Sequence, residues 1–161
     1  MLVQILIIYF GLGQMLRPTG FRWLNIGGTF TAGTVALSLN AGAYMAEIVR
    51  GGIEAVDKGQ IEAARSLGLT YGKTMKKIVL PQALRTMLPS IINQFIISIK
   101  DTSLLSVIGL TELTNVGKTI AATQSAHMMV IYCFMACYYL FICTVLAQVS
   151  KVVEKRLSYG K

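Results

Sequence analysis

Residues 62–81 of the chain read EAARSLGLTYGKTMKKIVLP, a basic and partly amphipathic segment. This is the only long polar stretch in the middle of the sequence, and uncharged apolar runs at residues 26–46 and 128–150 lie before and after it. A helix needs about 20 apolar residues to cross the roughly 30 Å core of a bilayer. Both runs meet this length, so the polar stretch is predicted to connect membrane-spanning helices.

The composition agrees with a membrane protein built from helices. Of the 161 residues, 54% are hydrophobic and only 14% are charged, and the mean hydropathy is +0.61. Such a chain is too apolar for an ordinary soluble domain and too short for two. The net charge of +8 is spread between long apolar runs, which argues against a nucleic-acid partner. We therefore expect an all-α, polytopic protein in a lipid bilayer.

The apolar runs predict about four spans. Besides the two runs above, these are residues 1–16, which are short for a crossing, and residues 81–100, with Pro81 in the first turn. The uncharged part of the latter, residues 86–99, gives only about 21 Å of helix. Either Arg85 extends to the inner interface, or Lys100 and Asp101 lie within the membrane, or both hold. The alternative is that Lys100 and Asp101 lie fully hydrated at the outer interface of the membrane. Residues 102–110 favour a short or re-entrant helix.

Two basic segments predict the orientation. Basic side chains outnumber acidic ones across residues 50–85, and residues 151–161 contain Lys151, Lys155, Arg156 and Lys161 against Glu154. Cytoplasmic segments of membrane proteins carry an excess of Lys and Arg. We therefore expect both segments in the cytoplasm.

Local signals within residues 50–85 predict a helix, a tight turn and a second helix. Asp57, with Gln60 three residues later, is a favourable N-cap and capping-box start, and Gly68 is a favourable C-terminal stop. Thr70 is expected to cap a second helix that runs to about residue 79. Residues 111–127 are expected to be a polar connection.

Small residues mark one face of the predicted span at residues 26–46. Gly28, Ala32, Ala36 and Asn40 recur at intervals of four. The simpler interpretation is that these small residues allow close packing between helices. The more specific interpretation is that this face lines a path for a substrate.

Sites for catalysis, metals or nucleotides are not predicted. Cys133, Cys137 and Cys143 fall in one apolar run without a His or acidic partner, and the single histidine, His127, has no acid and nucleophile arranged around it. The segment Gly117-Lys118-Thr119 lacks the glycine that a phosphate loop needs five residues earlier, where Glu112 stands.

The spacing within residues 62–81 resembles the EAA loop of permease subunits of ABC importers. Glu62-Ala63-Ala64 is followed by Gly68 and then by Ile78-x-Leu80-Pro81. Residues 40–52 (NAGAYMAEIVRGG), and Asn93-Gln94 followed by residues 99–104 (IKDTSL), are similar to two further signatures of the same family. Together the three stretches extend the resemblance over nearly the whole chain. Permeases for polar amino acids, of the glutamine, histidine, arginine or glutamate type, are the most similar.

This resemblance implies the transmembrane domain of a type I ABC importer over residues 1–150, an EAA loop at about residues 50–85 and a basic tail at residues 151–161. It places the subunit in the bacterial cytoplasmic (inner) membrane, with the loop and the C-terminus in the cytoplasm. The implied partners are a second permease subunit, identical or related, a dimer of cytoplasmic ATPases and an extracytoplasmic solute-binding protein. ATP would bind to the ATPase, so the permease would be no enzyme and would hold neither a cofactor nor a metal.

The resemblance also assigns roles to residues of this sequence. The residues expected to couple the permease to the ATPase are Glu62, Ala63, Ala64, Gly68, Ile78, Leu80 and Pro81. Candidates for the substrate path or its gate are Asn40, Tyr44, Glu47, Asn93, Gln94, Lys100, Asp101, Thr102 and Ser103.

Other functions stay open from the sequence. Family members usually begin with a further span before the part corresponding to residues 2–10, so the resemblance implies an N-terminally truncated chain. A membrane anchor or assembly subunit that recruits a cytoplasmic protein without moving solute is one alternative. An inactive truncated permease is another.

Overall fold

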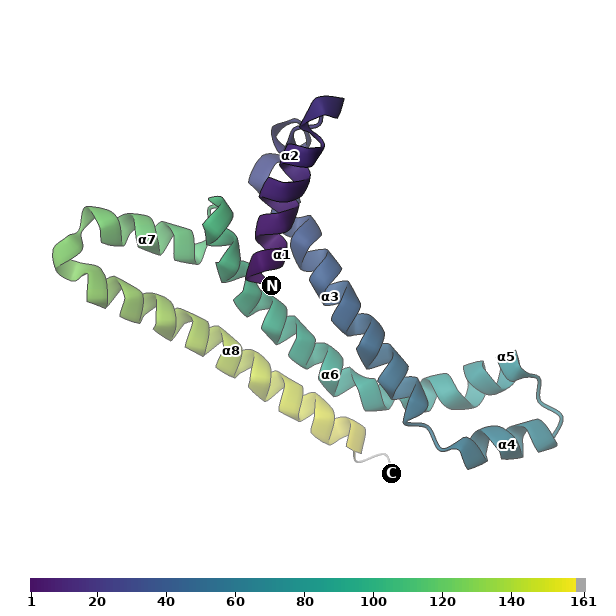
Figure 1. Ribbon diagram of the computed structural model, residues 1–161. Coiled ribbons are helices and arrows are strands. Elements are labelled where there is room, and N and C mark those ends of the chain that lie inside the picture. Colours follow the sequence, from purple (N-terminus) through teal and green to yellow (C-terminus); the bar gives the residue numbers. More distant parts are fainter. Residues whose placement is uncertain (159–161) are drawn as a thin grey trace. The chain divides into compact units, whose positions relative to one another are not determined.

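The computed structural model describes residues 1–158, and every element of regular structure in this range is helical (Figure 1). The chain divides into two compact units. Unit 1 comprises Met1–Gly42 and Ile96–Leu146, and unit 2 comprises Ala43–Phe95 with the described residues from Ala147 onward. Three long helices, α3, α6 and α8, contribute residues to both units.

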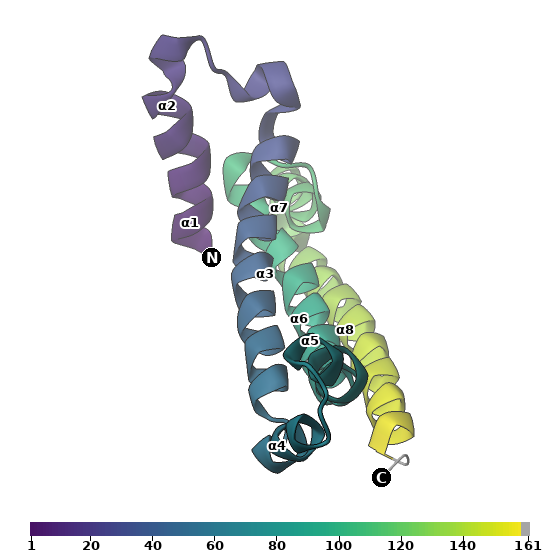
Figure 2. The same ribbon diagram turned by 90° about the vertical axis from the view of Figure 1, so that its right-hand side faces the viewer.

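Unit 1 begins with one helical rod made of α1 (Leu2–Leu6), the π-helical stretch η1 (Ile7–Leu12) and α2 (Gly13–Met15) (Figure 2). Ile5 and Ile8 are buried on this rod and form a cluster with Ala36, Leu105 and Ile108. Two short turns, η2 (Arg17–Thr19) and η3 (Trp23–Ile26), then lead to α3. The indole nitrogen of Trp23 donates a hydrogen bond of 3.1 Å to the carbonyl oxygen of Tyr9, which ties this loop to the rod.

Helix α3 (Gly28–Glu54) is the predicted span at residues 26–46 extended by two further turns. Its small residues are used for packing within unit 1, because Ala32 and Ala36 are fully buried there. A side chain at Gly33 would come within 3.1 Å of Leu105. The packing interpretation of the small residues at Ala32 and Ala36 is therefore supported.

In unit 2 a helical hairpin follows α3, with α4 (Lys58–Ser66) as its first arm and α5 (Tyr71–Thr74) continued by η4 (Met75–Val79) as its second (Figure 1). Asp57 is the N-cap of α4 and accepts a hydrogen bond of 2.8 Å from the amide of Gly59, as an N-cap aspartate should. Gly68 ends the first arm with φ +81°, a left-handed conformation that suits glycine. The predicted helix, turn and helix are confirmed.

The predicted break between the second arm and the following span is wrong. Residues 71–108 are one continuous helical segment that passes through Pro81, and α6 (Leu80–Asp101) begins directly after η4. The widened π-helical turn explains the continuity, because the amide of Leu80 bonds to the carbonyl of Met75, five residues back. This shift in the hydrogen-bond pattern occurs just before the position where proline has no N–H to donate.

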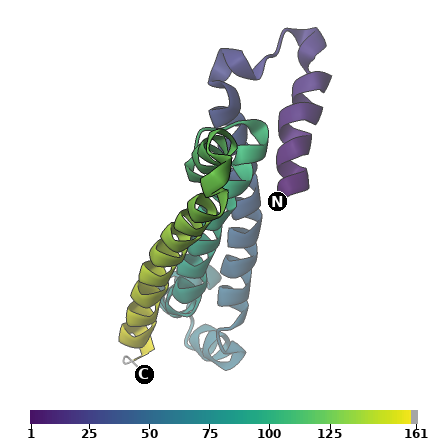
Figure 3. The same cartoon turned by 90° about the vertical axis from the view of Figure 1, so that its left-hand side faces the viewer.

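The last part of the chain belongs mostly to unit 1. Figure 3 shows its long C-terminal helix in light green to yellow. Helix α6 runs into η5 (Thr102–Ile108), which Gly109 ends with φ +78°. The polar connection expected at residues 111–127 contains a helix, α7 (Leu113–Thr123), and a short turn, η6 (Ser125–His127). Residues 117–119 are helical, so they form no phosphate loop. Helix α8 (Met128–Ser158) closes the described chain. Lys161, part of the predicted basic tail, lies outside the described residues.

In the described part of the chain, two helical segments are long and apolar enough to cross a membrane by length and composition, residues 71–108 and residues 128–152. The rod at residues 2–15 is apolar but shorter. Helix α3, with 27 residues, is about 40 Å long and also has the length of a span, but its small and hydroxylated residues make it less apolar.

Candidate functional site

The residues predicted to couple the chain to a partner gather on the hairpin of unit 2. Glu62 and Ala63 are exposed on α4, while Ala64 faces inward with 2% exposure. Gly68 forms the turn. Ile78, Leu80 and Pro81 lie where the second arm becomes α6, and Leu80 is 43% exposed.

The tip of the hairpin presents apolar side chains to solvent. Leu67 is 84% exposed and Tyr71 is 62% exposed, one on each side of the Gly68 turn. Large apolar side chains grouped at an exposed tip lose contact with water when a protein partner covers them. These two residues were not predicted as site residues, although their apolar character next to Gly68 was a signal.

The base of the hairpin is built on a small hydrophobic cluster. Val56, Val79, Ala83 and Met87 are buried together, and Ile61 of α4 packs against them. Gly52 lets α3 approach α6 closely, because a β-carbon there would lie 3.0 Å from Met87. The ends of α3 and α6 in unit 2 therefore form a firm platform for the second arm.

A polar contact connects the first arm to α6. The side-chain amide nitrogen of Gln82 donates to the side-chain oxygen of Gln60 at 2.6 Å and to the carbonyl of Ile78 at 3.1 Å. Gln60 was predicted to complete a capping box with Asp57, and its recorded side-chain bond instead goes to Gln82. The two residues are 22 positions apart, so no local pattern could indicate this pair.

A cavity of about 490 Å³ lies beside the arms of the hairpin. Its walls are mainly apolar, and its charged residues are Glu54 and Lys58. Thr74 contributes to the wall and is 1% exposed, and its hydroxyl has no hydrogen-bond partner among the described residues. The cavity also borders Val56 and Val79 of the base cluster, so packing is incomplete where the arms meet the base.

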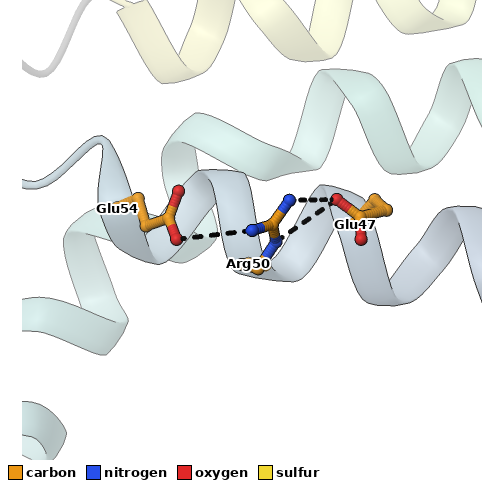
Figure 4. Close-up of polar contacts among 3 residues, drawn as sticks. All are labelled: Glu47, Arg50 and Glu54. Carbon is orange, nitrogen blue, oxygen red and sulfur yellow. Dashed lines mark hydrogen bonds and ion pairs between the residues drawn. The ribbon is translucent and has the colours of Figure 1, made fainter.

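Three charged residues lie along the exposed side of α3 just before the hairpin (Figure 4). The guanidinium of Arg50 contacts the carboxylate of Glu47 at 2.6 Å and that of Glu54 at 3.9 Å. The hydrogen bond to Glu47, together with the charges of both carboxylates, raises the pKa of Arg50 above its ordinary value. Arg50 is thus held by two neighbours on its own helix, and Glu47, a path candidate, is engaged in an ion pair.

The path candidates are divided between the two units. In unit 2, Tyr44 is 56% exposed, and the neighbours Asn93 and Gln94 of α6 differ sharply. Asn93 is exposed, whereas Gln94 is 5% exposed and its amide nitrogen has no partner among the described residues. Burying an amide N–H without a hydrogen-bond partner costs free energy of folding, so the position of Gln94 is unfavourable unless a ligand or another subunit accepts this hydrogen bond.

The other path candidates belong to unit 1. Asn40 is half-buried on α3, Lys100 is exposed and Asp101 is half-buried at the end of α6. Neither Lys100 nor Asp101 takes part in an ion pair recorded within residues 1–158. The hydroxyl groups of Thr102 and Ser103 bond back to the carbonyls of Ile99 and Lys100, at 2.6 and 2.7 Å. These two side chains therefore serve the transition from α6 to η5.

Unit 1 contains a polar contact that the sequence did not indicate. Glu112 is the N-cap of α7, and its two carboxylate oxygens accept bonds from the amides of Thr114 and Asn115 at 2.8 and 2.7 Å. The hydroxyl of Tyr139 on α8 lies 3.4 Å from the same carboxylate. Glutamate is not among the preferred N-cap residues, which is why α7 was missed.

Within residues 1–158, the helices of membrane length and the exposed hairpin that follows α3 are features expected of an integral membrane protein. Comparisons with known proteins give the particular group. Residues 1–159 match the family described as binding-protein-dependent transport system inner membrane component. The chain belongs to this family.

Individual relatives agree with this assignment. The chain is 44% identical to the glutamine transport system permease protein GlnP of Escherichia coli over 155 residues, which is 96% of this chain and 68% of that protein. It is 39% identical to the arginine transport system permease protein ArtQ of Bacillus subtilis over 157 residues, 98% of this chain and 68% of that protein.

A solved structure agrees with the fold. The crystal structure of an amino acid ABC transporter with histidines matches with a TM-score of 0.85 and 38% identity, over 96% of this chain and 68% of that one. The resemblance to amino acid importer permeases, the all-α membrane fold and the role of a transport subunit that is not itself an enzyme are confirmed.

Proposed function

We propose that this chain is the permease subunit that moves a polar amino acid inward across the bacterial inner membrane, driven by an ATPase that binds its hairpin. Permeases of this family work with an ATPase and a binding protein. The single observation that carries the coupling role is the hairpin itself, which exposes Glu62, Ala63, Leu67 and Tyr71 on a firm base.

The hairpin has the physical properties that coupling requires. A partner that moves α4 can transmit that movement only if the base is well packed, and Val79 and Ala83 are buried almost completely. Ala63 leaves room for a close approach, and Glu62 offers an exposed negative charge on an otherwise basic segment. We assign Glu62 to Gly68 to the contact with the ATPase, with Ile78, Leu80 and Pro81 at the junction with the membrane helix.

What the relatives share supports the proposed substrate class. GlnP and ArtQ serve glutamine and arginine, which have in common a polar side chain, an α-carboxylate and an α-ammonium group. The proposed path or gate residues are Asn40, Tyr44, Glu47, Asn93, Gln94, Lys100, Asp101, Thr102 and Ser103. Gln94 is the strongest of them, because its buried amide has no partner within residues 1–158 and could donate to a carboxylate.

The proposed orientation places the hairpin and the end of α8 in the cytoplasm, as their basic residues favour. Residues 1–150 would form the transmembrane domain and residues 151–161 a basic tail. A second permease subunit, the ATPase dimer and an extracytoplasmic solute-binding protein would complete the importer.

The test compares two charge reversals in the complete assembly. Glu62→Lys changes the exposed charge on α4, and Glu54→Lys is the matched control, because Glu54 is an exposed acid on α3 outside the hairpin arms. Both variants are purified with the ATPase, and amino acid uptake and ATP hydrolysis are measured in proteoliposomes. We expect Glu62→Lys to lose ATPase binding and uptake, and Glu54→Lys to keep most of both.

The contrary outcomes separate the alternatives. If wild type binds no ATPase, the coupling assignment fails. If wild type binds the ATPase but takes up no amino acid with any binding protein, the chain is an anchor or an inactive permease. Equal effects of the two reversals would mean that net charge, and not the hairpin, decides binding.

A further inference from the structure

The solvent-exposed contact between Gln60 and Gln82 joins α4, the first arm of the hairpin, to α6, which has several buried residues. The bond of 2.6 Å between the two amides runs from α4 to the first turn of α6. Because the amide of Gln82 also bonds to the carbonyl of Ile78 on its own helix, its position is fixed from the α6 side.

Helix α4 has few other attachments. Ala64 is its only buried residue, Ile61 packs against the cluster at the base, and the cavity of about 490 Å³ takes the place of further packing beside Ile61. Interiors that are incompletely packed constrain an element less than closely packed ones. A single polar contact therefore has a large share in fixing the orientation of α4.

The beginning of α6 is constrained much more strongly. Ala83, one residue after Gln82, is fully buried, and Val79 and Met87 are buried on the same side one turn before and after it. The close approach of Gly52 on α3 adds to this packing. Gln82 thus stands on a rigid element, and Gln60 stands on the arm that a partner would contact.

Besides the apolar contact of Ile61 with the base cluster, two routes connect α4 to α6. The covalent route begins at the Gly68 turn and continues through the short helix α5 and the stretch η4, and a glycine turn yields easily to a displacement. The direct route is the Gln60–Gln82 contact, which bypasses all of these. A displacement of α4 reaches α6 with the least loss along the direct route.

We propose that Gln60 and Gln82 form a polar strut that makes α6 follow α4 when the ATPase moves the hairpin. They are positioning residues, because they act through α6 and touch neither substrate nor ATP. This inference rests on the proposed coupling function and assigns the transmission step to two residues outside the contact with the ATPase.

The experiment separates binding of the ATPase from transmission. Gln60→Leu, Gln82→Leu and the double variant remove the contact, and Gln60→Glu with Gln82→Lys replaces it by an ion pair of similar reach. Thr119→Ala is the control, because the hydroxyl of Thr119 bonds to the carbonyl of Asn115 within its own helix, α7, outside the hairpin. The measurements are co-purification of the ATPase and the number of amino acids taken up per ATP hydrolysed.

We expect each leucine variant to keep the ATPase and to lower uptake per ATP about 3- to 10-fold, the range that corresponds to one neutral hydrogen bond. The double variant should be no worse than either single one, because both remove the same contact. The Glu–Lys pair should restore most of the ratio, and Thr119→Ala should leave it unchanged.

Three results would overturn the strut. These are additive losses in the double variant, no recovery in the Glu–Lys pair, and loss of ATPase binding in the leucine variants to the same degree as loss of uptake. The last result would mean that the contact only holds the hairpin in shape. If the proposed coupling function itself is wrong, the result is different, because the wild-type protein would then bind no ATPase.

Discussion

Gly117 of α7 lies directly beneath the sulfur atom of Met135 of α8, so close that a β-carbon at position 117 would overlap the thioether. Gly117 is buried and Met135 is half-buried. Helices α7 and α8 can therefore pack closely here only because residue 117 has no side chain. The side chain of Met135 occupies the space next to this glycine.

Gly117→Ala should destabilise unit 1 by about 1 kcal/mol, near the lower end of overpacking costs, because the flexible methionine can rotate away. The check is the thermal unfolding midpoint of the purified protein in detergent. Adding Met135→Ala should return part of the loss. If the loss of stability in the double variant equals the sum of the losses in the two single variants, the two residues do not interact.

Gly52→Ala should be more costly, by about 1–3 kcal/mol, because the added carbon would meet the β-carbon of Met87 at 3.0 Å and the carbonyl oxygen of Ala83 at 3.4 Å. Neither of these atoms can rotate away. The neighbouring Gly51 is the matched control, since its surroundings are open and alanine favours a helix by about 0.5–1 kcal/mol. Equal unfolding midpoints for the two variants would contradict close packing of α3 on α6.

Gly68→Ala should strain the turn of the hairpin by about 1–2 kcal/mol, because φ is +81° there and an L-residue disfavours this region. Space is not the issue, since nothing lies within 4 Å of the added carbon. Gly72→Ala, also in open space but without a positive φ, should be neutral or slightly stabilising. The two variants are compared by their rates of proteolytic cleavage at the hairpin. Faster cleavage of the Gly72 variant than of the Gly68 variant would mean that the positive φ at Gly68 is not what limits substitution there.

Glu112→Ala should destabilise the first turn of α7 by about 1 kcal/mol, since two backbone amides lose their acceptor. Hydrogen exchange of the amides of Thr114 and Asn115 should accelerate most. Tyr139→Phe serves as the comparison, because its contact with Glu112 is long, at 3.4 Å, and should matter less. If Tyr139→Phe accelerates exchange as much as Glu112→Ala does, the contact between α7 and α8, and not the N-cap at Glu112, holds the start of α7 in place.

The hairpin could be predicted from sequence because its determinants are local. Asp57 and Gly68 fix a cap and a turn by their own chemistry, and both were placed correctly. Thr70 stands at the predicted N-cap position, although its side chain makes no capping bond in the structure. The family resemblance rests on the same short-range spacing, which is why it could be recognised.

The features that escaped prediction depend on partners far along the chain or on unusual residues. Gln60 looked like half of a capping box, but its partner, Gln82, is 22 positions away. Pro81 looked like a helix start, and the widened turn that lets the helix continue has no simple sequence signal. Helix α7 starts at a glutamate, which sequence rules do not favour as a cap.

The hydrogen bond from the indole of Trp23 to the carbonyl of Tyr9 has a practical consequence. Trp23 is the only tryptophan in the sequence, so selective excitation of indole fluorescence reads a single point where the loop at residues 17–27 meets the N-terminal rod. Loss of that bond would expose the ring to water and shift its emission to longer wavelengths. Trp23 is thus an intrinsic fluorescent reporter, which can follow this loop in the purified subunit without any label.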